Sequence, residues 1–259
     1  MKSVSLLAAA GAACVSAVLV VAPVHAQETL HPVLVEAFAN SDLAAREEDW
    51  RFTLRVTNDD GELVGRFDGS LADGERWQLV SPPEDELSDM QAGLWAGFAE
   101  DEDEDGDEDG DEDGDDEAGD DDTGNGLFFS LAEADIAPGS LSLAEETGSG
   151  WIFDFEPELG DEEMDVAGHL RGRLTIGGRP TEVQELRLWA PESFKPHFAV
   201  RLHAFEMVQA YERVDGVPAP VLTRLSQSIS GSAAFQDFDQ SFELAFSDIE
   251  FLGEAVSGR

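Results

Sequence analysis

The spacing of apolar residues predicts a chain built mainly of β-strands. Residues 50–57 alternate strictly between apolar and polar side chains, which is typical of a strand with one buried face. The turn signal at residues 58–61 and the apolar positions in 63–67 and 76–80 extend this strand into an antiparallel meander.

The two-residue period returns in the second half of the chain. It is found at residues 151–155, 170–176, 182–189, 197–214, 221–235 and 241–251, and the serines at positions 226, 228, 230 and 232 share one face. Turn signals at 191–196, 215–220 and 236–240 are too short for crossover helices. We therefore expect these strands to pair antiparallel.

Helical spacing is weaker and covers fewer residues. An early helix is expected at residues 41–48 and a short one at 131–136. The clearest helix is predicted at 81–99, where two prolines and acidic residues precede an apolar stripe. The stripe consists of Leu87, Met90, Leu94, Trp95 and Phe98.

These elements predict a mainly β protein with few helices (α+β). A sheet of about nine to eleven strands with one apolar face needs a cover. We expect a single domain at residues 27–259, folded as a curved, antiparallel, unclosed half-barrel whose concave face is covered by helices. The helix ending at Phe98 is the best candidate for that cover.

An acidic stretch interrupts this domain at residues 100–126. Residues 101–122 contain 17 of the 57 acidic residues of the chain, no basic residue and almost no apolar side chain. Such a segment has no apolar surface to bury, so we expect a disordered, solvated, low-complexity loop.

The whole chain is acidic, with a formal net charge of −42 over 259 residues. This charge argues against nucleic acid and anionic membrane surfaces as partners. The only cysteine, Cys14, precedes the expected domain, so we expect neither disulfides nor thiolate metal sites in that domain.

The first 26 residues have the pattern of a secretory signal peptide. Lys2 gives a positive start, residues 6–21 are apolar, and Val24-His25-Ala26 has the form of a cleavage site. We expect cleavage near Ala26, a periplasmic or secreted mature protein, and no transmembrane segment in the mature chain.

The acidic stretch also contains the spacing of a calcium-binding loop. Alternating carboxylates, a glycine turn at Gly106 and a distal glutamate follow that pattern at Asp101, Asp103, Asp105, Asp107 and Glu112. A run made of Asp, Glu and Gly matches in several registers, so a structured calcium site, weak binding of divalent cations and a plain solvated spacer all remain open. No other cofactor is expected.

No pattern of a catalytic site is found in the sequence. The chain lacks G-x-S-x-G, H-E-x-x-H, P-loop and dinucleotide motifs. His197 and His203 fall in one predicted strand, but about 20 Å of strand separates them, too far to share a metal ion. We expect a protein that is not an enzyme.

The order of these elements resembles the periplasmic lipoprotein carrier and outer-membrane lipoprotein receptor superfamily, the LolA/LolB-like fold. The resemblance rests on an exported chain with an early helix, a meander at 50–80, a proline-started helix and long later strands, and on the segments 150–157 and 227–235. It implies an unclosed barrel with a helical lid over an apolar cavity for acyl chains.

We therefore expect a non-catalytic exported protein that accommodates a lipid or the acyl chains of a lipoprotein. The alternative is a cation-binding or scaffold protein that acts through its acidic stretch. In the first case the apolar lining is expected to consist of Trp50, Phe52, Trp77, Met90, Leu94, Trp95, Phe98, Trp151 and Phe153.

Overall fold

The computed structural model describes residues 30–41, 49–72, 74–99, 136–158, 166–234 and 236–253. The expected signal peptide, the acidic stretch with its candidate calcium ligands, and residues 42–48 and 131–135 of two expected helices lie outside these ranges.

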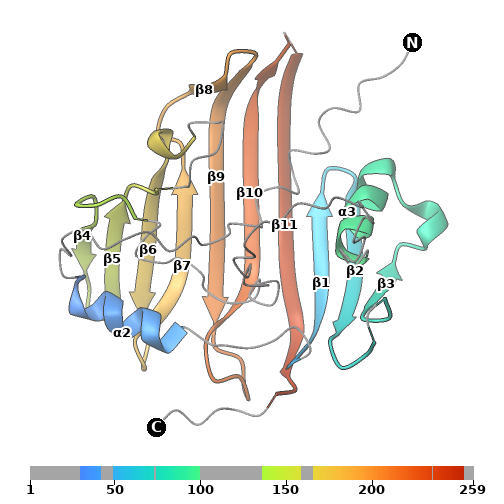
Figure 1. Cartoon of the computed structure of the whole chain (residues 1–259), viewed down its shortest axis with the longest axis horizontal. Helices are drawn as coiled ribbons and strands as arrows, with labels where there is room; N and C mark the ends of the chain where they lie inside the picture. Colours follow the sequence, from blue (N-terminus) through green and yellow to red (C-terminus); the bar gives the residue numbers. More distant parts are fainter. Residues whose placement is uncertain are drawn as a thin grey trace, which may run out of the picture.

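The described part of the chain forms one antiparallel sheet (Figure 1). Its strands are β1 (Trp50–Asn58), β2 (Gly61–Asp68), β3 (Trp77–Ser81), β4 (Ser142–Glu146), β5 (Gly150–Phe155), β6 (Arg171–Gly177), β7 (Glu182–Trp189), β8 (Phe194–His197), β9 (Val200–Glu212), β10 (Val221–Ala233) and β11 (Gln236–Phe251). The mainly β fold and the unclosed antiparallel sheet expected from the sequence are confirmed.

The strand order is β3-β2-β1-β11-β10-β9-β7-β6-β5-β4, and β8 pairs with β9 outside this path. The first and last strands are neighbours, because β1 pairs with β11 from Trp50↔Phe251 to Asn58↔Phe242. The long strands β9, β10 and β11 therefore form the middle of the sheet, and β3 and β4 form its two ends.

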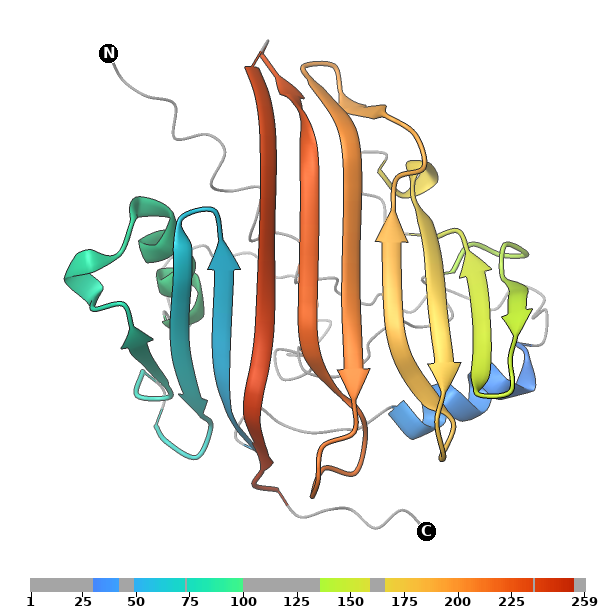
Figure 2. The same ribbon diagram turned by 180° about the vertical axis from the view of Figure 1, so that it is seen from behind.

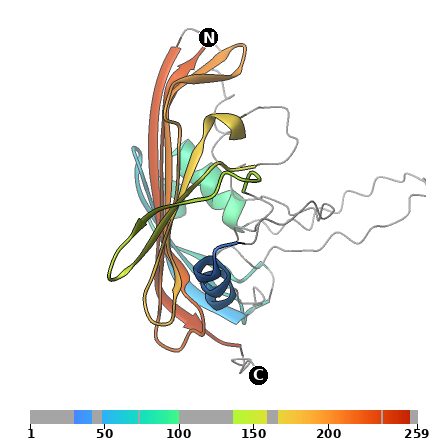
Figure 3. The same cartoon turned by 90° about the vertical axis from the view of Figure 1, so that its left-hand side faces the viewer.

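Two α-helices lie on the same side of this sheet (Figure 3). Helix α2 (Pro32–Ser41) lies against β7, and helix α3 (Asp89–Ala99) lies against β3. Short 3-10 turns are found at η2 (Glu84–Glu86) and η4 (Ala167–His169). Figure 2 shows the opposite face of the sheet, which carries no described helix.

The apolar residues under the helices form two separate hydrophobic cores. The first core lies under α3 and contains Trp50, Phe52, Leu54, Val56, Leu63 and Phe67. The second core lies under α2 and contains Leu34, Phe153, Phe155, Leu174, Ile176 and Leu186. Leu244 and Phe246 of β11 pack against both cores. A helix thus packs against each end of the sheet, and β11, β10 and β9 lie between the two cores.

The predicted starts of the two helices are wrong. Ser41, where the early helix was expected to begin, is the last described residue of α2, which begins at Pro32. Helix α3 begins at Asp89, after β3 has ended at Ser81. The reason for the later start is a reciprocal cap: the Gln91 N–H donates to Ser88 Oγ at 3.2 Å, and the Ser88 N–H donates to Gln91 Oε1 at 3.1 Å. This Ser-x-x-Gln signal was present in the sequence, but the prolines before it were given more weight.

Several strands also differ from the prediction, among them β8, which begins inside the expected turn at 191–196. The expected strand 197–214 is divided, because β8 ends at His197 and a turn precedes β9. The expected turn at 236–240 is the start of β11, and β4 was not predicted. Ile136, placed in a short helix, forms an isolated antiparallel bridge with Pro157 instead. The pattern of alternating residues is clear in strand interiors but weak at hairpin ends.

Candidate ligand-binding surface

Seven of the nine predicted lining residues lie at the α3 end of the sheet. Trp50 and Phe52 are buried in the first core, and Trp77, Leu94, Trp95 and Phe98 pack against it. The rings of Trp77 and Trp95 are 6.0 Å apart, edge to face, and Trp77 lies 5.6 Å from Phe98. Gly65 of β2 leaves room for the Trp95 ring, since a Cβ there would come within 2.7 Å of it.

Met90 is the exception in this group. It is 44% exposed on α3, and its sulfur accepts a hydrogen bond of 3.4 Å from the Asn58 side chain. Met90 therefore lies exposed at the N-terminal end of α3 and is not part of the first core.

The other two predicted lining residues lie at the opposite end of the sheet. Phe153 is 1% exposed in the second core, and Trp151 packs against that core. The strands β11, β10, β9, β7 and β6 separate these two residues from Trp50 and Phe52. The structure thus divides the predicted lining into two clusters and does not bring it together around one site.

Between the two cores, the face that carries the helices presents a strip of large apolar side chains. Pairing places Phe242, Gln227 and Met207 side by side on β11, β10 and β9, and Leu188 of β7 follows them. The adjacent row joins Leu244, Leu225 and Gln209. We call this surface the central strip and define it by Phe205, Met207, Gln227, Ile229, Phe242, Leu244 and Phe246.

The apolar members of the central strip are only partly buried, unlike the residues of the cores on either side. Phe205, Met207 and Phe242 pack against the edge of the second core, and Phe246 lies 5.5 Å from Phe52 of the first core. The strip therefore forms a continuous apolar path from α3 to α2. Sequence analysis placed all of these residues in strands but did not assign them to the site, because their common face depends on the pairing of β9, β10 and β11.

Gln227 is the buried polar residue of the central strip, at 8% exposure. Three other buried polar side chains have partners: Ser41 Oγ accepts from the Val183 N–H, Gln91 bonds with Ser88, and Glu182 pairs with Arg213. No hydrogen bond is formed by the Gln227 side chain in the described part of the chain. Gln227 thus differs from its buried polar counterparts.

The neighbouring polar pair on this face is satisfied internally. The Tyr211 hydroxyl donates to Gln209 Oε1 at 2.7 Å, and Tyr211 is 5% exposed. Burial raises the pKa of the Tyr211 hydroxyl, so this group stays protonated and keeps its role as a donor. Gln209 is therefore already engaged.

The opposite face of the sheet carries the charged side chains. Its ion pairs include Arg51–Asp68, Arg51–Glu250, Arg55–Glu62, Arg171–Glu156, Arg173–Asp154, Arg187–Glu206 and Arg224–Glu243. Arg173 donates twice to Asp154, at 2.7 and 3.1 Å, and this carboxylate raises the pKa of Arg173. Trp189 also lies on this face, under the guanidinium groups of Arg173 and Arg187.

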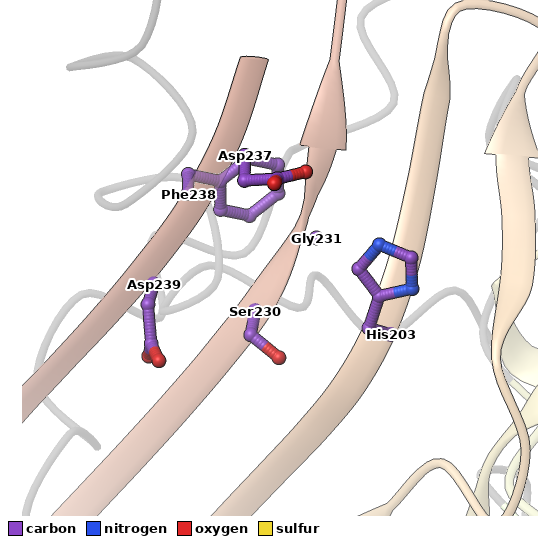
Figure 4. Close-up of a pocket in the computed structure, with 6 residues that line it drawn as sticks. All are labelled: His203, Ser230, Gly231, Asp237, Phe238 and Asp239. Carbon is purple, nitrogen blue, oxygen red and sulfur yellow. The ribbon is translucent and has the colours of Figure 1, made fainter. Parts of the chain in front are cut away.

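Two shallow hollows involve the long strands. One, of about 510 Å³, lies around Glu206, Ser228 and Glu243 of the charged face, and Gln227 and Phe242 also contribute to its lining. The other, of about 360 Å³, is formed near the β10–β11 hairpin, where Figure 4 shows His203, Ser230 and Asp239 on three neighbouring strands. Their linings contain serine hydroxyls and carboxylates together with apolar side chains such as Phe238 and Val208.

The described residues offer no metal centre. Within them, no three His, Cys, Asp or Glu side chains are grouped so that they could hold a metal ion. His197 and His203, predicted to lie in one strand, belong to β8 and β9. The predicted calcium ligands between Asp101 and Glu112 fall outside the described residues, so that interpretation stays a prediction.

Neither described helix is long and apolar enough to cross a membrane. Comparisons of the chain with protein-family models, with curated proteins and with solved structures found no match. The interpretation of the central strip therefore depends on the geometry of this chain alone.

Proposed function

We propose that this protein is an exported, non-catalytic binding protein that holds a lipid or the acyl chains of a lipoprotein on the central strip. The observation that carries the proposal is the division of the apolar face: two closed cores lie under the helices, and a partly exposed apolar path joins them. An acyl chain of about 15 to 20 Å matches a path that crosses several strands spaced about 4.8 Å apart.

The separation of charge between the two faces supports this proposal. The ion pairs lie on the face without helices, whereas the central strip consists of aromatic and aliphatic side chains with one amide. Burial of apolar surface is worth about 25 cal/mol per Å², so an acyl chain gains most on the strip. The proposed curvature of the sheet, with α3 covering a concave face, would enclose such a chain further.

The resemblance to the lipoprotein carrier superfamily agrees with this proposal but rests on the order of elements. The alternative function, cation binding by the acidic stretch, has its residues outside the described ranges and is independent of the strip. The two functions predict different ligands for the purified protein: lipid in the first case, and divalent cations such as calcium in the second.

Two neighbouring residues of β9 give a matched test of the binding face. Met207 lies on the central strip and Val208 on the charged face. Met207→Gln is expected to weaken binding of a fluorescent acyl lipid about tenfold, because it places an amide under the acyl chain. Val208→Gln makes a similar change on the other face and is expected to leave binding unchanged.

Fluorescence titration of both variants gives the affinities, and mass spectrometry of an organic extract identifies lipid that co-purifies with the native protein. Equal losses in the two variants, or a wild-type protein that binds no acyl lipid, would contradict the proposed function. A rise in melting temperature with calcium in such a protein would favour the alternative.

A further inference from the structure

The position of Gln227 indicates which kind of acyl ligand the central strip would take. Gln227 lies in the middle of one cross-strand row, with Phe242 on one side and Met207 on the other. Along β10 it shares its face with Leu225, which is 8% exposed, and with Ile229. A side-chain amide is therefore held at the centre of an apolar surface.

The Gln227 side chain is largely buried, but its amide nitrogen and oxygen are not among the fully buried unpaired polar atoms of the described residues, so they stay accessible to solvent or to a ligand. Most buried polar side chains form at least one hydrogen bond, and leaving one unmade is unfavourable. Gln227 forms none with the described residues, although the nearby Gln209 accepts one from Tyr211. A leucine at this position would only continue the apolar strip, whereas an accessible amide there can form a hydrogen bond with a ligand on the strip.

We propose that the Gln227 amide is the polar anchor of the central strip, donating a hydrogen bond to the carbonyl oxygen of a neutral acyl ester or acyl amide. This inference rests on the proposed function, because it assumes that an acyl chain lies on the strip. The hydrocarbon part of the ligand would contact Met207, Phe242 and Leu244, and its carbonyl group would lie over Gln227.

The charge of the protein favours a neutral head over a free fatty acid. The chain carries a formal net charge of −42, which repels a carboxylate. The anchor itself is uncharged and supplies both a donor and an acceptor. Both an ester and an acyl amide present a carbonyl oxygen that can accept from the Gln227 amide N–H, and this is the recognition chemistry they share. An acyl amide can in addition donate its own N–H to the Gln227 side-chain oxygen.

Competition with a fluorescent apolar probe, N-phenyl-1-naphthylamine, tests the anchor on the whole purified protein. Methyl laurate is expected to bind the wild-type protein about three- to tenfold more tightly than an alkane of matched length, the effect of one neutral hydrogen bond. Gln227→Leu is expected to remove this difference, and Ser228→Ala, on the opposite face of β10, to retain it. Laurate, used as a competitor at pH 7, is expected to bind more weakly than methyl laurate. N-methyl lauramide is expected to bind at least as tightly as methyl laurate.

The outcomes separate failure of the anchor from failure of the proposed function. If the ester and the alkane compete equally well in the wild-type protein, or if the difference persists in Gln227→Leu, the anchor is overturned and acyl binding stands. If neither competitor displaces the probe, both are overturned. Gln227→Leu is also expected to melt at the wild-type temperature or above it, and a drop of several degrees would show that the amide has an internal partner.

Discussion

Replacing Phe155 with alanine is expected to lower the free energy of unfolding by about 3 to 5 kcal/mol. Phe155 is 2% exposed in the second core, and its ring lies over Gly172 of β6. A Cβ at Gly172 would come within 2.2 Å of that ring, so the Phe155 ring fits here because residue 172 is a glycine. Removing the ring leaves a cavity, and urea denaturation followed by circular dichroism measures the loss.

Gly172→Ala provides the matched control for this contact. Alone, it is expected to destabilise the protein by about 1 to 3 kcal/mol, because the ring of Phe155 has to move. Added to Phe155→Ala, the same methyl group occupies part of the vacated space, so the double variant is expected to be at least as stable as Phe155→Ala. A double variant that shows the full sum of both losses would contradict the packing of the ring on the glycine.

Replacing Arg213 with leucine is expected to destabilise the protein by about 1 to 3 kcal/mol. The Arg213 guanidinium forms an ion pair with the carboxylate of Glu182, which is 8% exposed at the start of β7, and its Nε donates to Glu182 Oε2 at 3.3 Å. Arg213 also donates to the Pro218 carbonyl at 3.1 Å. The substitution leaves a buried carboxylate without its cation.

The double variant Glu182→Leu/Arg213→Leu separates the loss of the ion pair from the cost of leaving the Glu182 carboxylate without its cation. It is expected to be more stable than Arg213→Leu, because the uncompensated buried carboxylate is gone. The loss in Arg213→Leu is expected at the lower end of the range, because the arginine side chain is 41% exposed. Wild-type stability of Arg213→Leu in urea denaturation would show that the pair contributes nothing.

The strands were predictable because burial on one face imposes a local pattern. Trp50, Phe52, Leu54 and Val56 alternate in the sequence and are all buried in β1. The start of α3 was predicted too early, because the Ser88–Gln91 cap was not recognised in the sequence. Hairpin ends were misplaced where turn residues such as Gln236 continue a strand.

The candidate site was less predictable because it depends on long-range pairing. Trp50 and Trp151 have similar surroundings in the sequence, yet five strands separate β1 from β5 in the sheet. Phe242 and Met207, which are 35 positions apart, lie on either side of Gln227. No periodicity within one segment reveals that neighbourhood, which follows from the antiparallel register of β9, β10 and β11.

Quenching of tryptophan fluorescence by a brominated acyl chain tests the central claim most directly. The chain has five tryptophans, of which Trp189 lies on the charged face beneath two arginines. Trp50, Trp77, Trp95 and Trp151 are in the two cores or pack against them. A chain bound on the central strip is expected to quench this group and leave Trp189 emitting, so Trp189→Phe is expected to raise the quenched fraction. Quenching that is absent in the wild-type protein, or that disappears in Trp189→Phe, would contradict acyl binding on the central strip.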